Sequence, residues 1–108
     1  MLDVVIVAVV VLMLSTMSLR ANRRLHGEPS LPMQWGLNGD VNWSAPRRIA
    51  LAFTPLLAII CLSAALVSDI VSPSDEATFA IAVMAVMFVA VHALHLWLIN
   101  RWQRTGGR

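Results

Sequence analysis

The sequence predicts an all-α membrane protein, a single domain over residues 1–108, with three transmembrane helices and a Pro/Gly-rich loop between the first and the second. Two observations carry this prediction. Of the 108 residues, 58% are hydrophobic and only 13% are charged, whereas a typical soluble domain is about half apolar and about a quarter charged. The apolar residues are also gathered into three long blocks, at about 4–19, 49–71 and 77–99, a pattern typical of membrane spans.

The first block, residues 4–19, is preceded by an acid and followed by three arginines. A helix of this length reaches about 25 Å, slightly less than the ~30 Å hydrocarbon core of a bilayer, and local thinning of the bilayer accommodates the difference. A cleaved signal peptide is the alternative, but such a peptide carries positive charge before its apolar run. The order is reversed here, so we expect an uncleaved anchor.

The second block, residues 49–71, follows Pro46 at the expected helix start and contains Pro55. Because proline lacks an amide hydrogen, we expect the carbonyl one turn earlier to lose its helical partner and the helix to bend. Four small residues further along are candidates for a close helix–helix contact: Ser63, Ala64, Ala65 and Ser68.

The third block, residues 77–99, is preceded by Ser74, which we expect to cap the helix with acids in its first turn. A polar tail, residues 100–108, follows. His92 and His95 lie one helical turn apart on this span, and ionisable residues in a span usually face the bundle interior. Two interpretations stay open, namely interhelical hydrogen bonds or, with ligands from a second chain, a metal or haem site.

The charges indicate how the spans are oriented. Three spans place the loop at 20–48 and the tail at 100–108 on the same side, and all eight arginines fall there. The opposite side carries only acids: Asp3, Asp69, Asp75 and Glu76. Because arginine is translocated reluctantly, the basic side is expected to be cytoplasmic. We therefore expect a multi-pass protein of the bacterial cytoplasmic (inner) membrane, with its N-terminus outside and its C-terminus in the cytoplasm.

The distribution of arginine and tryptophan also indicates the partners. The arginines flank apolar blocks rather than forming a patch on a soluble surface, so no nucleic-acid partner is expected. The lipid bilayer is the expected partner, and the arginines near 20–24 and at 47–48 are candidates for contact with anionic headgroups. All four tryptophans lie toward the same side, as in an interfacial aromatic belt: Trp35, Trp43, Trp97 and Trp102.

The loop between the first two spans holds the densest cluster of special residues in the chain. Pro29 and Pro32 fix backbone angles, and Gly36 and Gly39 permit tight or left-handed turns. Neither helical nor alternating apolar periodicity persists across it, so we expect an ordered but irregular loop. Its candidate binding residues are Leu31, Pro32, Gln34, Trp35, Gly39 and Asp40.

Each of these loop residues has a functional and a structural interpretation. We expect Trp35 at the membrane interface, Gly39 in a left-handed turn, and Asp40 paired with Arg47 or Arg48. These features suit a ligand-binding loop, but turn chemistry alone also explains a structural loop that caps the bundle.

The stretch Leu31-Pro32-x-Gln34-Trp35-x-x-x-Gly39-Asp40 resembles the N-terminal membrane domain of the SdpI-type family, bacterial immunity proteins for a sporulation-delaying toxin. That domain typically carries [Ile/Leu]-Pro-x-His-[Trp/Phe]-Asn-x-x-Gly-x-x-Asp between its first two spans, followed by a proline-containing second span. This chain departs at three positions, with Gln34 for the usual histidine, Gly36 for the usual asparagine or aspartate, and Asn42 for the later acid. The resemblance implies a membrane domain of immunity- or sensor-like function.

No catalytic constellation, phosphate-binding loop or cofactor motif is visible, and Cys61 is the only cysteine. We therefore expect a protein that is not an enzyme, with no cofactor and no metal. The resemblance favours a small protein that binds a toxic peptide or a regulator. The alternatives are an accessory subunit that stabilises a larger membrane complex or transporter, and a histidine-ligated redox module. Because three helices bury little surface between them, a membrane-protein partner or a homo-oligomer is also expected.

Overall fold

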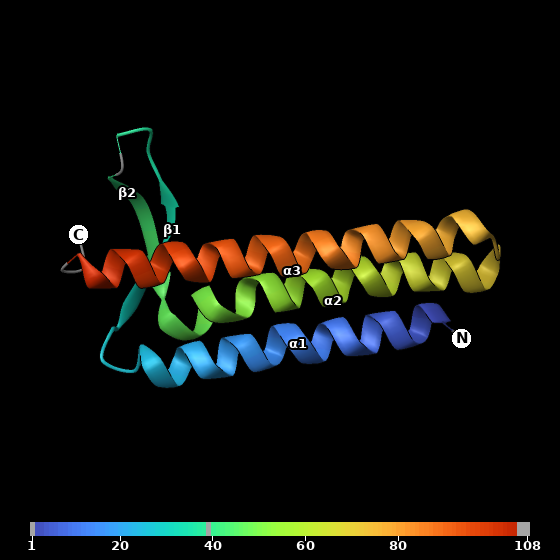
Figure 1. Ribbon diagram of the computed structural model, residues 1–108, viewed down its shortest axis with the longest axis horizontal. Helices are drawn as coiled ribbons and strands as arrows, with labels where there is room; N and C mark the ends of the chain where they lie inside the picture. The colour runs from blue at the N-terminus through green and yellow to red at the C-terminus, as the bar shows by residue number, and fades with distance from the viewer. Residues whose placement is uncertain (1, 39, 106–108) are drawn as a thin grey trace.

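The computed structural model describes residues 2–38 and 40–105, and its three helices form an elongated bundle (Figure 1). The elements in chain order are α1 (Leu2–Arg24), β1 (Ser30–Trp35), β2 (Val41–Pro46), α2 (Arg47–Val71) and α3 (Asp75–Arg104). The two strands lie across one end of the bundle, beside the end of α1, the start of α2 and the end of α3 (Figure 1). We call this the hairpin end. The N-terminus and the α2–α3 connection lie at the opposite end.

All three helices are long and apolar enough to cross a membrane, which confirms the three predicted apolar helices. Two of them run well past the apolar blocks, α1 to Arg24 and α3 to Arg104. Arginine is a good helix former, and a positive charge in the last turn is favoured by the helix dipole. The helix starts are as expected: α2 begins directly after Pro46, and the Ser74 hydroxyl accepts the amide hydrogen of Ala77 at 3.0 Å.

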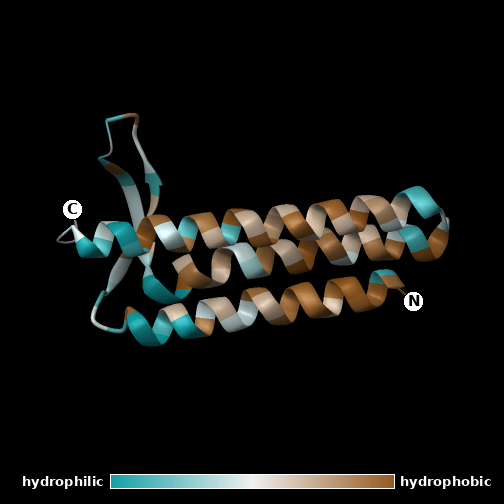
Figure 2. Cartoon of the chain, viewed as in Figure 1, coloured by the Kyte–Doolittle hydropathy of each residue, from teal (hydrophilic) through white to brown (hydrophobic). Residues whose placement is uncertain are grey.

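The outward faces of the helices are apolar over most of their length. Large side chains such as Leu12 and Phe79 are 68% and 72% exposed, and hydrophilic residues gather at the two ends of the bundle (Figure 2). Surfaces of this kind are compatible with contact to lipid chains. The chain therefore has the architecture of a multi-pass membrane protein.

Two apolar clusters hold the bundle together. The cluster at the hairpin end consists of Ala21, Leu25, Leu31, Ala45, Ala50, Leu51, Leu96 and Ile99. The cluster in the other half consists of Val7, Val10, Leu14, Ala58, Leu62, Ile81 and Ala85.

The small residues in these clusters are not the ones that the sequence suggested. The small residues of α2 that are buried in the clusters are Ala50 and Ala58, whereas Ser63, Ala64 and Ser68 are exposed. Those three residues therefore form no contact inside the bundle that the structure describes. Of the four, Ala65 alone packs against a cluster.

The expected irregular loop is partly a β-hairpin, so the prediction of an all-α fold needs correction here. Strands β1 and β2 pair antiparallel, from Ser30 opposite Pro46 to Trp35 opposite Val41. The register shifts twice, between Pro32 and Gln34 and again between Gln34 and Trp35. A two-stranded sheet has only edge strands, where proline is tolerated. The register shifts interrupt the alternation of apolar and polar residues by which a strand is recognised.

Candidate functional site

The base of the hairpin is fixed to α3 through His95. Leu31 and Pro32 are fully buried, and the Nε2 atom of His95 lies 3.1 Å from the carbonyl oxygen of Pro32. Because a carbonyl only accepts, the Nε2 atom of His95 carries the hydrogen. The Trp35 ring meets the His95 ring edge-on, with centroids 6.1 Å apart, a favourable aromatic geometry. Three of the six candidate loop residues thus anchor the hairpin.

The outer part of the hairpin is held by its own hydrogen bonds. The indole N–H of Trp43 donates to the side-chain oxygen of Gln34 at 3.1 Å, and the amide of Gly36 donates to the carbonyl of Asp40 at 2.7 Å. The side chains of Asn38 and Asp40 are also bonded to each other, at 3.0 Å. Gln34 and Asp40 are both exposed. The sixth candidate residue, Gly39, lies outside the described residues.

At the tip, Leu37 is fully exposed, and the outer ends of β1 and β2 extend away from the helices (Figure 1). A Cβ atom at Gly36 would lie 3.1 Å from the Asn38 side-chain oxygen and 3.2 Å from that of Asn42, so this turn is tightly packed on itself. The hairpin therefore presents a compact tip with an apolar side chain on its outside.

Arg47 does not pair with Asp40, contrary to the prediction. Its Nε atom donates to the Asn22 side-chain oxygen at 2.8 Å, and its Nη1 atom lies 2.7 Å from the carbonyl oxygen of His26 and 3.0 Å from that of Glu28. These groups belong to the end of α1 and the turn that follows it, where unpaired carbonyls carry partial negative charge. Arg47 thus joins the end of α1 to the start of α2.

Ser18, Leu51 and His92 form a polar junction between the two apolar clusters, with one group from each helix. The Ser18 hydroxyl donates to the carbonyl of Leu51 at 2.7 Å, and it lies 2.8 Å from the Nε2 atom of a fully buried His92. A serine hydroxyl has a single hydrogen, so His92 is the donor in the second bond. We call these three groups the Ser18 junction.

The Ser18 junction exists because of Pro55. Leu51 lies four residues before Pro55, so its carbonyl is the one that proline leaves without a helical amide. The freed carbonyl was predicted from the sequence, but its partner on α1 was not. The Nδ1 atom of His92 has no hydrogen-bond partner among the described residues.

The two histidines of α3 therefore do not form one site. His92 bonds to α1 through its Nε2 atom, and His95 bonds to the hairpin through the same ring atom. In the part of the chain that the structure describes, no three side chains of histidine, cysteine, aspartate or glutamate come together in a way that would hold a metal ion. This geometry favours hydrogen bonding over a shared metal or haem site for these histidines.

Sequence reasoning missed three of these contacts, namely His95 with the loop, Ser18 with His92, and Arg47 with Asn22. Their partners are 63, 74 and 25 residues apart in the chain. For the two contacts that involve His95 and His92, a polar residue inside an apolar span was the available signal, since such residues usually have a partner in the bundle.

Comparisons of the chain with protein-family models, with curated proteins and with solved structures each gave no match. The resemblance to the SdpI-type family therefore stays a prediction.

Replacing His95 with leucine is expected to loosen the hairpin but not the bundle. The variant loses a hydrogen bond to Pro32 and the ring contact with Trp35, which together contribute about 1–2 kcal/mol. Amide hydrogen exchange in β1 and β2, followed by mass spectrometry, should then quicken about tenfold, since about 1.4 kcal/mol corresponds to a factor of ten. His26→Gln, at an exposed histidine outside the hairpin, is the control. Equal exchange in the two variants would show that His95 does not anchor the hairpin.

Proposed function

We propose that this chain is a non-enzymatic protein of the bacterial cytoplasmic membrane, with immunity- or sensor-like function, which binds a membrane-active peptide or a regulator through the tip of its hairpin. One observation carries the proposal: the base of the hairpin is anchored to α3 at Pro32, whereas its tip extends past the helices with Leu37 fully exposed. A binding loop that is already held by hydrogen bonds loses less conformational entropy on binding than an unstructured one. The resemblance to the SdpI-type family supports the same function.

The charges support an orientation with the N-terminus outside and the C-terminus in the cytoplasm. Arginines of α1, α2 and α3 lie at the hairpin end, whereas Asp3, Asp69, Asp75 and Glu76 lie at the other. By the positive-inside rule the hairpin then lies at the cytoplasmic face. A peptide or regulator that reaches this hairpin acts from the cytoplasm or from within the bilayer.

An accessory subunit of a larger membrane complex is the second candidate. The observation that favours it is the small interior of the bundle, because large apolar side chains on all three helices face outward. In a bilayer such faces contact lipid or the helices of another protein.

A photo-crosslinking amino acid at position 37 tests both candidates in living cells. We expect one discrete adduct at position 37, and a Trp43→Ala change beside the tip should lower its yield at least fivefold. The same group at Thr105, which is exposed at the same end of the bundle, is the matched control. If the yield of adduct at position 37 is no higher than at position 105, the proposed recognition role is overturned.

The mass of the adduct and its conditions separate the two candidates. A small peptide adduct that forms only when cells meet a membrane-active peptide supports the immunity- or sensor-like function. A constant adduct to a larger membrane protein, with a one-to-one complex by native mass spectrometry, supports the accessory subunit instead.

A further inference from the structure

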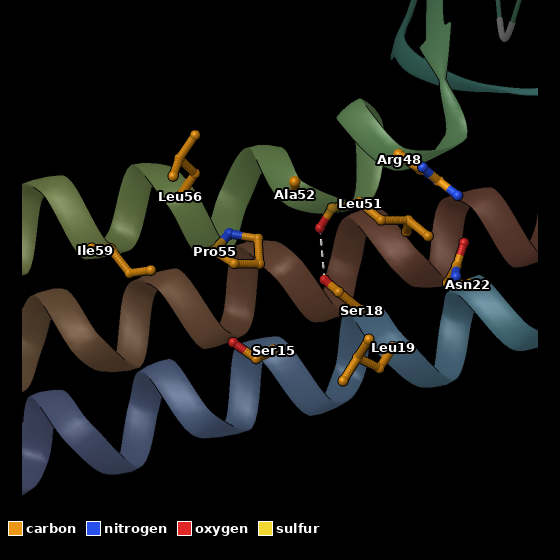
Figure 3. Close-up of a pocket in the computed structure, with 10 residues that line it drawn as sticks. All are labelled: Ser15, Ser18, Leu19, Asn22, Arg48, Leu51, Ala52, Pro55, Leu56 and Ile59. Carbon is orange, nitrogen blue, oxygen red and sulfur yellow. Dashed lines mark hydrogen bonds between the residues drawn. The ribbon is translucent and has the colours of Figure 1, made fainter.

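A groove runs along the outside of the bundle between α1 and α2 (Figure 3). Its volume is about 500 Å³, within the range of sites that hold small molecules. The side chains of Leu19, Leu56 and Ile59 supply apolar walls, and the small side chain of Ala52 leaves room between them. The groove lies on the spans themselves, so its surroundings in a membrane are lipid rather than water.

The hairpin end of this groove is polar. Arg48 from α2 and Asn22 from α1 lie together there (Figure 3). The neighbouring Arg47 is occupied by the end of α1, whereas Arg48 is exposed and has no hydrogen bond or ion pair with any described residue. An arginine guanidinium matches a phosphate group in charge and in the geometry of its donors.

The side chain of Asn22 is oriented so that it can donate a second hydrogen bond to a phosphate group. Its side-chain oxygen accepts the hydrogen bond from Arg47 at 2.8 Å, so the amide nitrogen of the same side chain stays available as a donor. Arg47 therefore positions Asn22 without occupying the groove. A phosphate beside Arg48 would meet a fixed positive charge and a pre-oriented amide donor.

We propose that this groove binds one anionic phospholipid from the leaflet on the hairpin side, with its phosphate at Arg48 and Asn22 and an acyl chain along Leu19, Leu56 and Ile59. Charge complementarity favours this occupant, since the groove is uncharged along the span, where Ser15 and Ser18 are its polar lining residues, and positive only at Arg48, at the depth of the headgroups. A helix from a second copy would have to bring an acid to that depth. The proposal does not depend on what the hairpin tip binds.

Native mass spectrometry of the protein released from bilayers of phosphatidylglycerol and phosphatidylcholine tests the phosphate contact. We expect the wild type to retain phosphatidylglycerol in preference to phosphatidylcholine, and Arg48→Gln to lower that preference about fivefold. Arg23→Gln removes an equal charge from an exposed position near the end of α1 that does not line the groove and should change the preference less than twofold. An equal fall in both variants would overturn the site, because it would indicate general attraction to a basic surface.

Filling the groove tests the position of the acyl chain. Ala52→Phe places a ring between the apolar walls and should lower retention of both lipids at least fivefold. Ala64→Phe adds the same ring at an exposed alanine of α2 that does not line the groove and should leave retention unchanged. Unaltered lipid retention in Ala52→Phe would overturn the proposal. If the wild type is instead a dimer and Ala52→Phe is not, the groove holds a second copy of the chain, and the proposal is likewise overturned.

Discussion

Replacing Ser18 with alanine is expected to lower the free energy of unfolding by about 2 kcal/mol. An average interhelical hydrogen bond in a membrane contributes only about 0.6 kcal/mol. This one side chain, however, serves the carbonyl of Leu51 and the Nε2–H group of His92, and its loss leaves both without a partner. Each unsatisfied buried group costs about 1–3 kcal/mol. Unfolding in mixed detergents, followed by circular dichroism, measures the difference.

Pro55→Ala should partly rescue the Ser18→Ala variant. Alanine at position 55 restores an amide hydrogen that can bond to the Leu51 carbonyl within α2. In that background, Ser18→Ala should cost about 1 kcal/mol less than it does alone, and a double-mutant cycle isolates this coupling from the loss of proline packing. Full additivity of the two changes would show that the freed carbonyl does not explain the contribution of Ser18.

Ser15→Ala is the matched control for these measurements. Ser15 lies one turn before Ser18 on α1 and has no hydrogen bond to another helix among the described residues. Its removal should change the free energy of unfolding by less than about 0.5 kcal/mol. A loss as large as that of Ser18→Ala would indicate that any serine at this depth of α1 stabilises the bundle, independently of the Ser18 junction.

The three helices that are able to span a membrane could be predicted from the sequence because their signal is local. Length and hydropathy suffice to identify a span, and the Ser74 cap and the carbonyl freed by Pro55 also follow from neighbouring residues. The ends of α1 and α3 could not be placed, because Arg24 and Arg104 are compatible with both a helix and a polar connection. Their helical state depends on packing against the rest of the hairpin end.

The hairpin was not predicted because its strands lack a regular pattern. Leu31 and Pro32 are adjacent and both buried, which an alternating strand does not allow. Both are covered here because β1 packs against α2 as well as α3. The residues of the candidate site were predicted, but their separation into an anchored base and an outer tip was not. Leu31, Pro32 and Trp35 anchor the base of the hairpin, and Asp40 belongs to the tip. That division depends on His95, a contact across 63 residues that no local pattern contains.

Replacing Arg47 with alanine is expected to destabilise the hairpin end by about 2–3 kcal/mol. The guanidinium bonds to Asn22 and to the carbonyls of His26 and Glu28, and hydrogen bonds from a charged group are worth about 1.5–3 kcal/mol each when buried. Because Arg47 is half-exposed, we expect the combined contribution of its hydrogen bonds to stability to be well below that of fully buried bonds. Thermal unfolding gives the overall loss, and amide exchange in residues 24–29 should show that the turn after α1 opens first.

Arg48→Ala is the control for charge, since it removes the adjacent arginine, which has no bond to a described residue. In detergent without anionic lipid it should change the free energy of unfolding by less than about 0.5 kcal/mol. Arg47→Lys keeps the charge, but a single ammonium group cannot reach both the Asn22 side chain and the turn carbonyls, so we expect it to recover less than half of the lost stability. Full recovery by lysine would mean that positive charge at the end of α1 is sufficient. The forked geometry of Arg47 would then not be what fixes the end of α1 and the turn after it to α2.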